Sequence, residues 1–239
     1  MTLALPNLPD WLAHRATTSE AREALVVGGR RWSYGELDAE VTRLARRLGA
    51  LGVGAGDRIA TLLHNGPVAS MIVHAALRLG ATLVPLNVRL SDEETAWQAG
   101  DAGARLLVVE ERTTALAERT RLALPNLPIV SVDTLDATPE SMTELHLSHD
   151  PAHVLAIIYT SGTTGRPKGA MLTVGNFWWS AVGSALNLGA DASDRWLACM
   201  PLFHVGGLSI LLRAAIHGFA AVVHDGFDAH AVKRAVQEE

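Results

Sequence analysis

Apolar residues in the first half of the chain repeat with helical and strand periods in turn. The stretch 33–49 predicts an amphipathic helix, because one face carries Leu37, Val41, Leu44, Ala45 and Leu48. Ser33 and Glu36 have the spacing of a capping box at its start. Just before it, Gly28 and Gly29 lie between two short apolar runs, a pattern that predicts a tight hairpin.

The alternation continues toward residue 124. A helix is expected from Pro67 to Leu79, and Ser91 and Glu94 open another that runs to about Gln98. Further helix is predicted over 113–124, and buried strands over 57–65, 81–87, 104–110 and 153–160. Strand and helix in this order predict an α/β fold whose mainly parallel sheets are covered by helices.

Residues 134–152 are polar and have no sustained period. They are the best candidate for a connection, so we expect a first lobe over 1–150 and the start of a second over 151–239. Residues 229–239 predict a closing amphipathic helix.

Composition narrows the possible functions. A formal net charge of -5 with interleaved signs gives no basic stripe for nucleic acid. The single Cys199 permits neither a disulfide framework nor a cysteine zinc site and favours a reducing, cytoplasmic setting. Arg213 and His217 interrupt the longest apolar stretch, so no membrane span is expected.

The most informative stretch is YTSGTTGRPKGAM, residues 159–171, which begins at the end of a predicted strand. In parallel sheets, ligands bind beyond the carboxyl ends of strands. Three glycines allow the backbone to approach an anion closely: Gly162, Gly165 and Gly169. Hydroxyl groups that can donate hydrogen bonds come from Thr160, Ser161, Thr163 and Thr164. Positive charge comes from Arg166 and Lys168. A solvent-exposed turn is the alternative. The P-loop pattern is absent, because Pro167 occupies the position that would continue it from Gly162.

The run YTSGTTGRPKG resembles the phosphate-binding signature of the acyl-adenylate-forming (AMP-binding) enzymes, which include acyl-CoA synthetases, adenylation domains of peptide synthetases and luciferases. Residues 32–65 and the stretch MPLFHVGGL, residues 200–208, resemble further motifs of that superfamily. Residues 173–189 and 196–218 are similar to its o-succinylbenzoate-CoA ligases of menaquinone biosynthesis.

The resemblance implies an ATP-dependent ligase that converts a small carboxylic acid to an acyl adenylate and then to a CoA thioester. ATP, Mg²⁺ and CoA are its implied ligands, and no metal ligand can be named. The residues implied to hold the β- and γ-phosphates are Thr160, Ser161, Gly162, Thr163, Thr164 and Gly165, with Lys168 adding charge.

Lys168 and His204 are the candidate catalytic residues. His204 follows Phe203 in an apolar segment, so both a pocket-lining role and a satisfied core histidine remain open. His224 and His230, six residues apart, are interpreted as surface residues. For Trp178 and Trp179, helix packing is favoured over the acyl pocket.

The superfamily's chains are about twice this length. The motif aromatic-Gly-x-Thr-Glu, the ribose-binding Asp, the hinge and the C-terminal domain have no counterpart in the sequence. The expected function is therefore that of an N-terminal fragment, inactive alone and open to self-association. A nucleotide-binding fragment without turnover, an inert structural fragment, and a ligase for a fatty or aryl acid are the alternatives.

Overall fold

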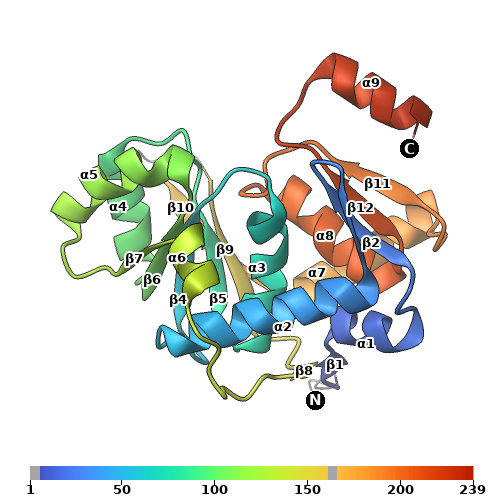
Figure 1. Ribbon diagram of the computed structural model, residues 1–239, viewed down its shortest axis with the longest axis horizontal. Helices are drawn as coiled ribbons and strands as arrows, with labels where there is room; N and C mark the ends of the chain where they lie inside the picture. The colour runs from blue at the N-terminus through green and yellow to red at the C-terminus, as the bar shows by residue number, and fades with distance from the viewer. Residues whose placement is uncertain (1–5, 161–165, 239) are drawn as a thin grey trace.

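The computed structural model describes residues 6–160 and 166–238. Its largest sheet has six strands in the order β10–β9–β5–β4–β6–β7 (Figure 1). These are β4 (Arg58–Leu62), β5 (Thr82–Pro85), β6 (Leu106–Val109), β7 (Ile129–Ser131), β9 (Val154–Thr160) and β10 (Lys168–Thr173). All neighbours pair in parallel except β9 and β10, which form an antiparallel hairpin. The predicted α/β fold with a mainly parallel sheet is confirmed.

A second sheet has four strands in the order β11–β12–β2–β3. Its strands are β2 (Glu23–Val27), β3 (Arg30–Ser33), β11 (Arg195–Ala198) and β12 (Ala220–Val223). β2 and β3 form the predicted hairpin, and Gly28 and Gly29 take the positive φ angles of 57° and 82° that its tight turn requires. A small pair, β1 (Leu8–Pro9) with β8 (Ser148–His149), lies near the N-terminus.

Helices cover both faces of the large sheet (Figure 1). The helices of the described chain are α1 (Trp11–Thr18), α2 (Tyr34–Ala50), α3 (Pro67–Arg78), α4 (Asp92–Asp101), α5 (Thr114–Ala123), α6 (Val132–Ala137), α7 (Val174–Leu188), α8 (Val205–His217) and α9 (Ala229–Glu238), with a 3-10 turn at Glu111–Thr113. Helices α4 and α5 pack on one face, while α2, α3 and α8 fill the space between the two sheets.

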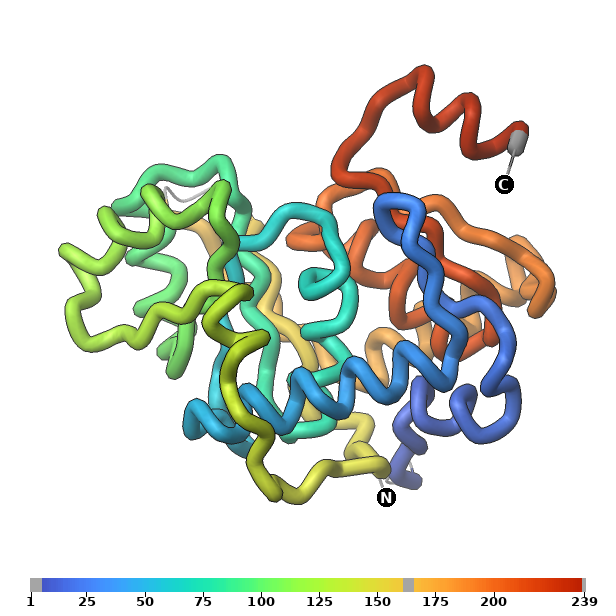
Figure 2. Tube along the Cα trace, viewed as in Figure 1, coloured from blue at the N-terminus to red at the C-terminus, as the bar shows by residue number. Residues whose placement is uncertain are grey.

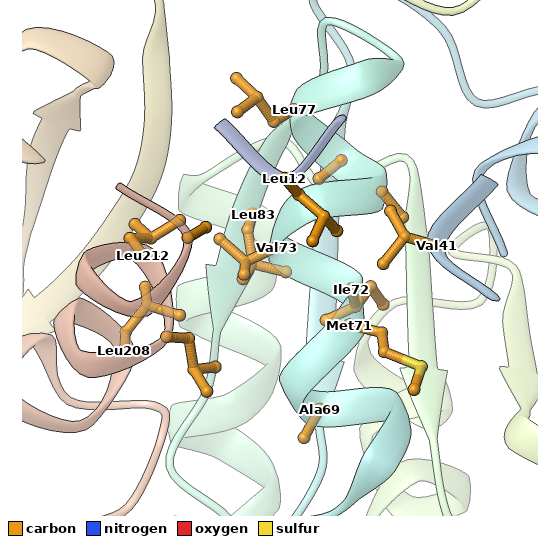
Figure 3. Close-up of a cluster of buried hydrophobic side chains, with 14 of the residues drawn as sticks. Leu12, Val41, Ala69, Met71, Ile72, Val73, Leu77, Leu83, Leu208 and Leu212 are labelled. Carbon is orange, nitrogen blue, oxygen red and sulfur yellow. The ribbon is translucent and has the colours of Figure 1, made fainter. Parts of the chain in front are cut away.

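Successive side chains of a strand point to opposite faces of the sheet, and this alternation divides the buried residues between two cores. Along β4, Ile59 faces the core between the sheets and Ala60 faces the core under α4 and α5. Because each face of the strand is buried, its sequence is a continuous apolar run rather than an alternating one. Figure 3 shows how α3 joins the parts: Val73 lies close to Leu83 of β5 and to Leu208 and Leu212 of α8.

The predicted capping boxes are present. The Ser33 side chain accepts from the Glu36 backbone N–H, and the Glu36 carboxylate accepts from the Ser33 N–H. Ser91 and Glu94 make the same reciprocal pair at the start of α4. Each cap satisfies backbone donors that the first helical turn leaves free.

Residues 134–152 are more than a connection. They begin inside α6 and include β8, which pairs with β1. His149 is buried there beside Asp10, whose carboxylate also binds Arg78. Burial opposes the charge on Asp10, but the hydrogen bonds from His149 and Arg78 outweigh it and hold the Asp10 pKa well below its usual range. These elements are too short for a periodic signal, and their partners lie far away in sequence.

The strands of the two sheets do not divide at residue 150. β9 and β10 complete the first sheet, whereas β2 and β3 join β11 and β12 in the second. Figure 2 shows the N-terminal hairpin lying beside the C-terminal part of the chain. The division into lobes 1–150 and 151–239 thus stays a prediction about domains. Each of the two larger sheets contains strands from both ranges.

Candidate functional site

The antiparallel hairpin β9–β10 carries both ends of the glycine- and threonine-rich stretch. Thr160, the last residue of β9, lies opposite Lys168, the first of β10. Directly opposed residues point to the same face of a sheet, so the hydroxyl and the ammonium group share one side of the hairpin. Ser161, Gly162, Thr163, Thr164 and Gly165 lie outside the described residues, so their predicted phosphate contacts stay predictions.

Gly169 is needed for packing within the hairpin rather than for a backbone turn. It lies within β10, opposite Tyr159, and has no positive φ angle. A Cβ atom at this position would lie 2.8 Å from the Ile157 side chain and 3.3 Å from the Tyr159 ring. The absence of a side chain therefore lets the Tyr159 ring lie across the strand, which is why this position of the motif needs glycine.

Helix α4 contacts the end of β9 and the segment that precedes β10. The Tyr159 hydroxyl donates to Asp101 Oδ2 at 2.6 Å, and its ring meets the Trp97 ring edge-on at 5.8 Å. The Arg166 guanidinium lies 5.8 Å from the Trp97 ring centroid. Burial, together with the neighbouring Asp101 carboxylate, raises the pKa of Tyr159, so it stays a protonated donor.

His204 enters the site from the second sheet. It follows β11 and is the N-cap residue of α8, with its ring 4.6 Å from that of Phe203. The side chain is exposed, which rules out the satisfied core histidine. Gly207 permits this sharp start, because a Cβ atom there would lie 2.5 Å from the Pro201 carbonyl oxygen.

Asn65 ties this segment to the first sheet. It follows β4 and is only 7% exposed. Its Nδ2 group donates to the carbonyls of Met200 at 3.0 Å and His224 at 2.8 Å, and its Oδ1 accepts from Leu202 N–H at 2.9 Å. The amide thus satisfies backbone groups that follow both β11 and β12.

These segments enclose a pocket of about 450 Å³ at the carboxyl ends of β5 and β9. Its lining residues are Pro85, Asn87, Leu90, Glu94, Gln98, Tyr159, Thr160, Pro167, Phe203 and His204. The fold therefore brings Thr160 and His204 to one pocket, although they are far apart in sequence. This is the position at which parallel α/β sheets bind ligands.

The other predicted residues divide between packing and surface. Trp178 stacks on Trp11 with ring centroids 6.5 Å apart, whereas Trp179 is 56% exposed. His230 is exposed, as expected, and His224 is half-buried. The sequence interpretation missed Asn65, Trp97 and Gln98, because each depends on a contact between distant segments.

In the part of the chain that is described, no cluster of three or more His, Cys, Asp or Glu side chains could hold a metal ion. Over the same ranges, none of the helices combines the length and apolar character needed to cross a bilayer.

Comparison with known proteins identifies the family. The model of the AMP-binding enzyme family matches residues 12–239. The chain belongs to the AMP-binding enzymes. Among curated members, 2-succinylbenzoate–CoA ligase of Geobacillus kaustophilus (strain HTA426) is 41% identical over 224 residues, covering 94% of this chain and 44% of that protein. The ligase of Bacillus cereus (strain ATCC 14579) is 37% identical over 98% of this chain and 46% of its own length.

Solved structures of AMP-binding enzymes agree in fold. The o-succinylbenzoate CoA synthetase of Bacillus subtilis, in complex with its acyl-adenylate intermediate, superposes with a TM-score of 0.91 at 35% identity, covering 98% of this chain and 47% of that one. A structure of the same enzyme with ATP and a magnesium ion gives 0.89 at 34% identity, covering 97% and 61%. The chain spans about half the length of the curated relatives it matches.

Proposed function

We propose that this chain is the ATP-binding part of an acid–CoA ligase that acts on o-succinylbenzoate. The observation that carries the proposal is the pocket that joins Thr160, at the end of β9, to His204 of the stretch MPLFHVGGL. Membership of the AMP-binding enzymes and the similarity to 2-succinylbenzoate–CoA ligases support it.

In this proposal the hairpin holds the outer phosphates of ATP. Thr160 and the stretch Ser161, Gly162, Thr163, Thr164 and Gly165 donate hydroxyl and backbone hydrogen bonds, and Lys168 adds a positive charge. Within the described ranges, the Lys168 ammonium forms no ion pair and is exposed, so its charge is available to a ligand. Mg²⁺ bound to the phosphates would supply the remaining neutralisation.

The acid carboxylate attacks the α-phosphorus of ATP, the bond to the pyrophosphate oxygen breaks, and an acyl adenylate forms. The CoA thiol then displaces AMP, giving the thioester. The residues of this chain orient the reactants and neutralise charge rather than form covalent intermediates. His204, at the wall of the pocket, donates a hydrogen bond to the acyl carboxylate and holds it for attack.

The distal carboxylate of o-succinylbenzoate needs a cation, and no Arg or Lys lines the pocket among its described residues. Arg213, on α8, donates to Ser180 Oγ at 3.0 Å and lies outside the pocket lining. The acid specificity in this proposal therefore rests on the similarity to relatives, with a fatty or aryl acid as the alternative substrate.

Titration of the chain with MgATP by calorimetry tests the phosphate site. Replacing Lys168 by Ala removes a charge-assisted contact and is expected to weaken binding by about tenfold or more. Lys233→Ala, at the only other lysine of the sequence, lies exposed on α9 and serves as the matched control. Equal affinity of both variants would remove Lys168 from the site.

A second experiment tests the reaction. Alone, the chain is expected to bind MgATP without catalysing acid-dependent exchange of pyrophosphate into ATP, since it spans about half the length of its relatives. Joined to the remaining part of the Geobacillus kaustophilus ligase, it is expected to support exchange with o-succinylbenzoate and much less with benzoate or a fatty acid. A preference for either of those acids would contradict the assignment.

A further inference from the structure

The pocket between Thr160 and His204 has an unusual balance of polar groups. Its described lining contains one acidic side chain, Glu94, and neither Arg nor Lys. The remaining polar groups are uncharged amides and two hydroxyls, apart from the His204 ring. The described lining therefore offers hydrogen-bonding groups rather than positive charge to the part of a ligand that lies against α4.

Gln98 is the most deeply buried polar side chain of this lining. It lies on α4 and is only 4% exposed. A glutamine amide offers two donors and an acceptor with two lone pairs. Within the described part of the chain, no hydrogen bond is made by the Gln98 side chain, although it borders the pocket.

Among the described residues, the amide atoms of Gln98 are not part of the set of fully buried side-chain atoms without a partner, so they are open to the pocket. Asn65 differs, since its amide makes three hydrogen bonds to backbone groups. Packing also fixes the position of Gln98, because its neighbour Trp97 and nearby Asp101 attach α4 to the hairpin. Gln98 is therefore held in place at the pocket wall with its hydrogen-bonding groups unused.

We propose that Gln98 is a ligand-binding residue that hydrogen-bonds an uncharged polar group of the bound organic substrate, such as an amide or carbonyl. The proposal rests on the proposed function for the location of the substrate. It divides the site into two parts: charged phosphates at the Thr160 and Lys168 end of the hairpin, and an uncharged part of a ligand against α4.

Thermal unfolding of the unliganded chain gives the first test. Methionine has nearly the volume of glutamine and no amide, so Gln98→Met is expected to change the Tm by no more than about 2 °C, because the amide makes no hydrogen bond to the described protein. Gln237→Met, at the only other glutamine, lies exposed on α9 and is expected to leave Tm unchanged. A Tm lower by about 4 °C or more for Gln98→Met, or failure to fold, would show that the protein itself uses the amide and would overturn the proposal.

Ligand titration gives the second test, with magnesium tripolyphosphate, o-succinylbenzoate and CoA as separate probes. Gln98→Met is expected to weaken the binding of an organic probe at least fivefold and to leave the binding of tripolyphosphate unchanged. An equal loss of affinity for tripolyphosphate would overturn the proposal. So would an unchanged affinity for every organic probe that the wild type binds. If the wild-type chain binds none of the three, the proposed function fails for this chain, and the size of the Tm change alone then tests the role of Gln98.

Discussion

Two buried amides at the site differ in how their hydrogen bonds are used. Asn65 gives both its donor and its acceptor to backbone groups of Met200, Leu202 and His224. Gln98 uses neither within the described chain. A satisfied amide stabilises the fold, so an apolar replacement should cost stability at Asn65 and change it little at Gln98, whose amide is open to the pocket.

For Asn65, replacement by Ala leaves three backbone groups without partners. We expect a loss of about 2–4 kcal/mol in the free energy of unfolding, measured by urea denaturation. Asn65→Asp keeps the acceptor for Leu202 N–H but loses both donors, so it also destabilises.

The control is Asn126→Ala, since Asn126 is exposed. This substitution should change stability by no more than about 0.5 kcal/mol. If Asn65→Ala were as mild as this control, Asn65 could not be what joins the His204 segment to the first sheet.

At the scale of elements, α4 and the hairpin β9–β10 form one unit through Trp97, Asp101, Tyr159 and Arg166. Trp97→Ala removes the contacts to Tyr159 of β9 and to Arg166, which precedes β10. Hydrogen exchange at the backbone amides of Thr160, Lys168 and Gly169 is then expected to rise by about tenfold, the equivalent of roughly 1.4 kcal/mol in local opening.

Trp97→Phe keeps an aromatic face for Tyr159 and Arg166, and the exchange rates should rise much less. Trp179→Ala provides a control, because that indole is 56% exposed on α7. Unchanged exchange at the hairpin in Trp97→Ala would mean that α4 does not hold it.

Local sequence patterns were sufficient to predict many of the helices and turns. The capping boxes at Ser33 and Ser91 and the turn at Gly28 and Gly29 depend on residues a few positions apart, and all three are present. The packing reason for glycine at position 169 could not be predicted, because it depends on a ring across the strand rather than on the local backbone.

Sequence patterns also predicted only those site residues that belong to a local motif. The motifs predicted Thr160, Lys168 and His204, and the structure joins Thr160 and His204 at one pocket. Asn65 could not be found, because its partners lie beyond residue 200. No single-sequence pattern records which backbone carbonyls a distant asparagine will meet.

Over the whole molecule, large apolar side chains are exposed on several elements. On α7, Trp179 and Leu186 are two helical turns apart and share a face, with Leu186 85% exposed. Phe227 is 73% exposed before α9. Clustered apolar exposure of this kind is typical of a surface that contacts other protein.

We therefore expect the chain to self-associate, with sedimentation coefficients that rise with protein concentration. Leu186→Lys should reduce this association. Leu122→Lys adds the same charge at an equally exposed leucine on α5 and should have little effect. A compact monomer at all concentrations, with a sharp melting transition, would contradict the expectation.

The pairing of β2 with β12 has a consequence for how the protein is made. Leu25 lies opposite Ala221, so the N-terminal hairpin acquires its parallel neighbour only after most of the chain has left the ribosome. At typical rates of synthesis this interval is on the order of 10–40 s. During that time β2 exposes an unpaired apolar edge, which makes the nascent chain a natural client for chaperones that shield such edges.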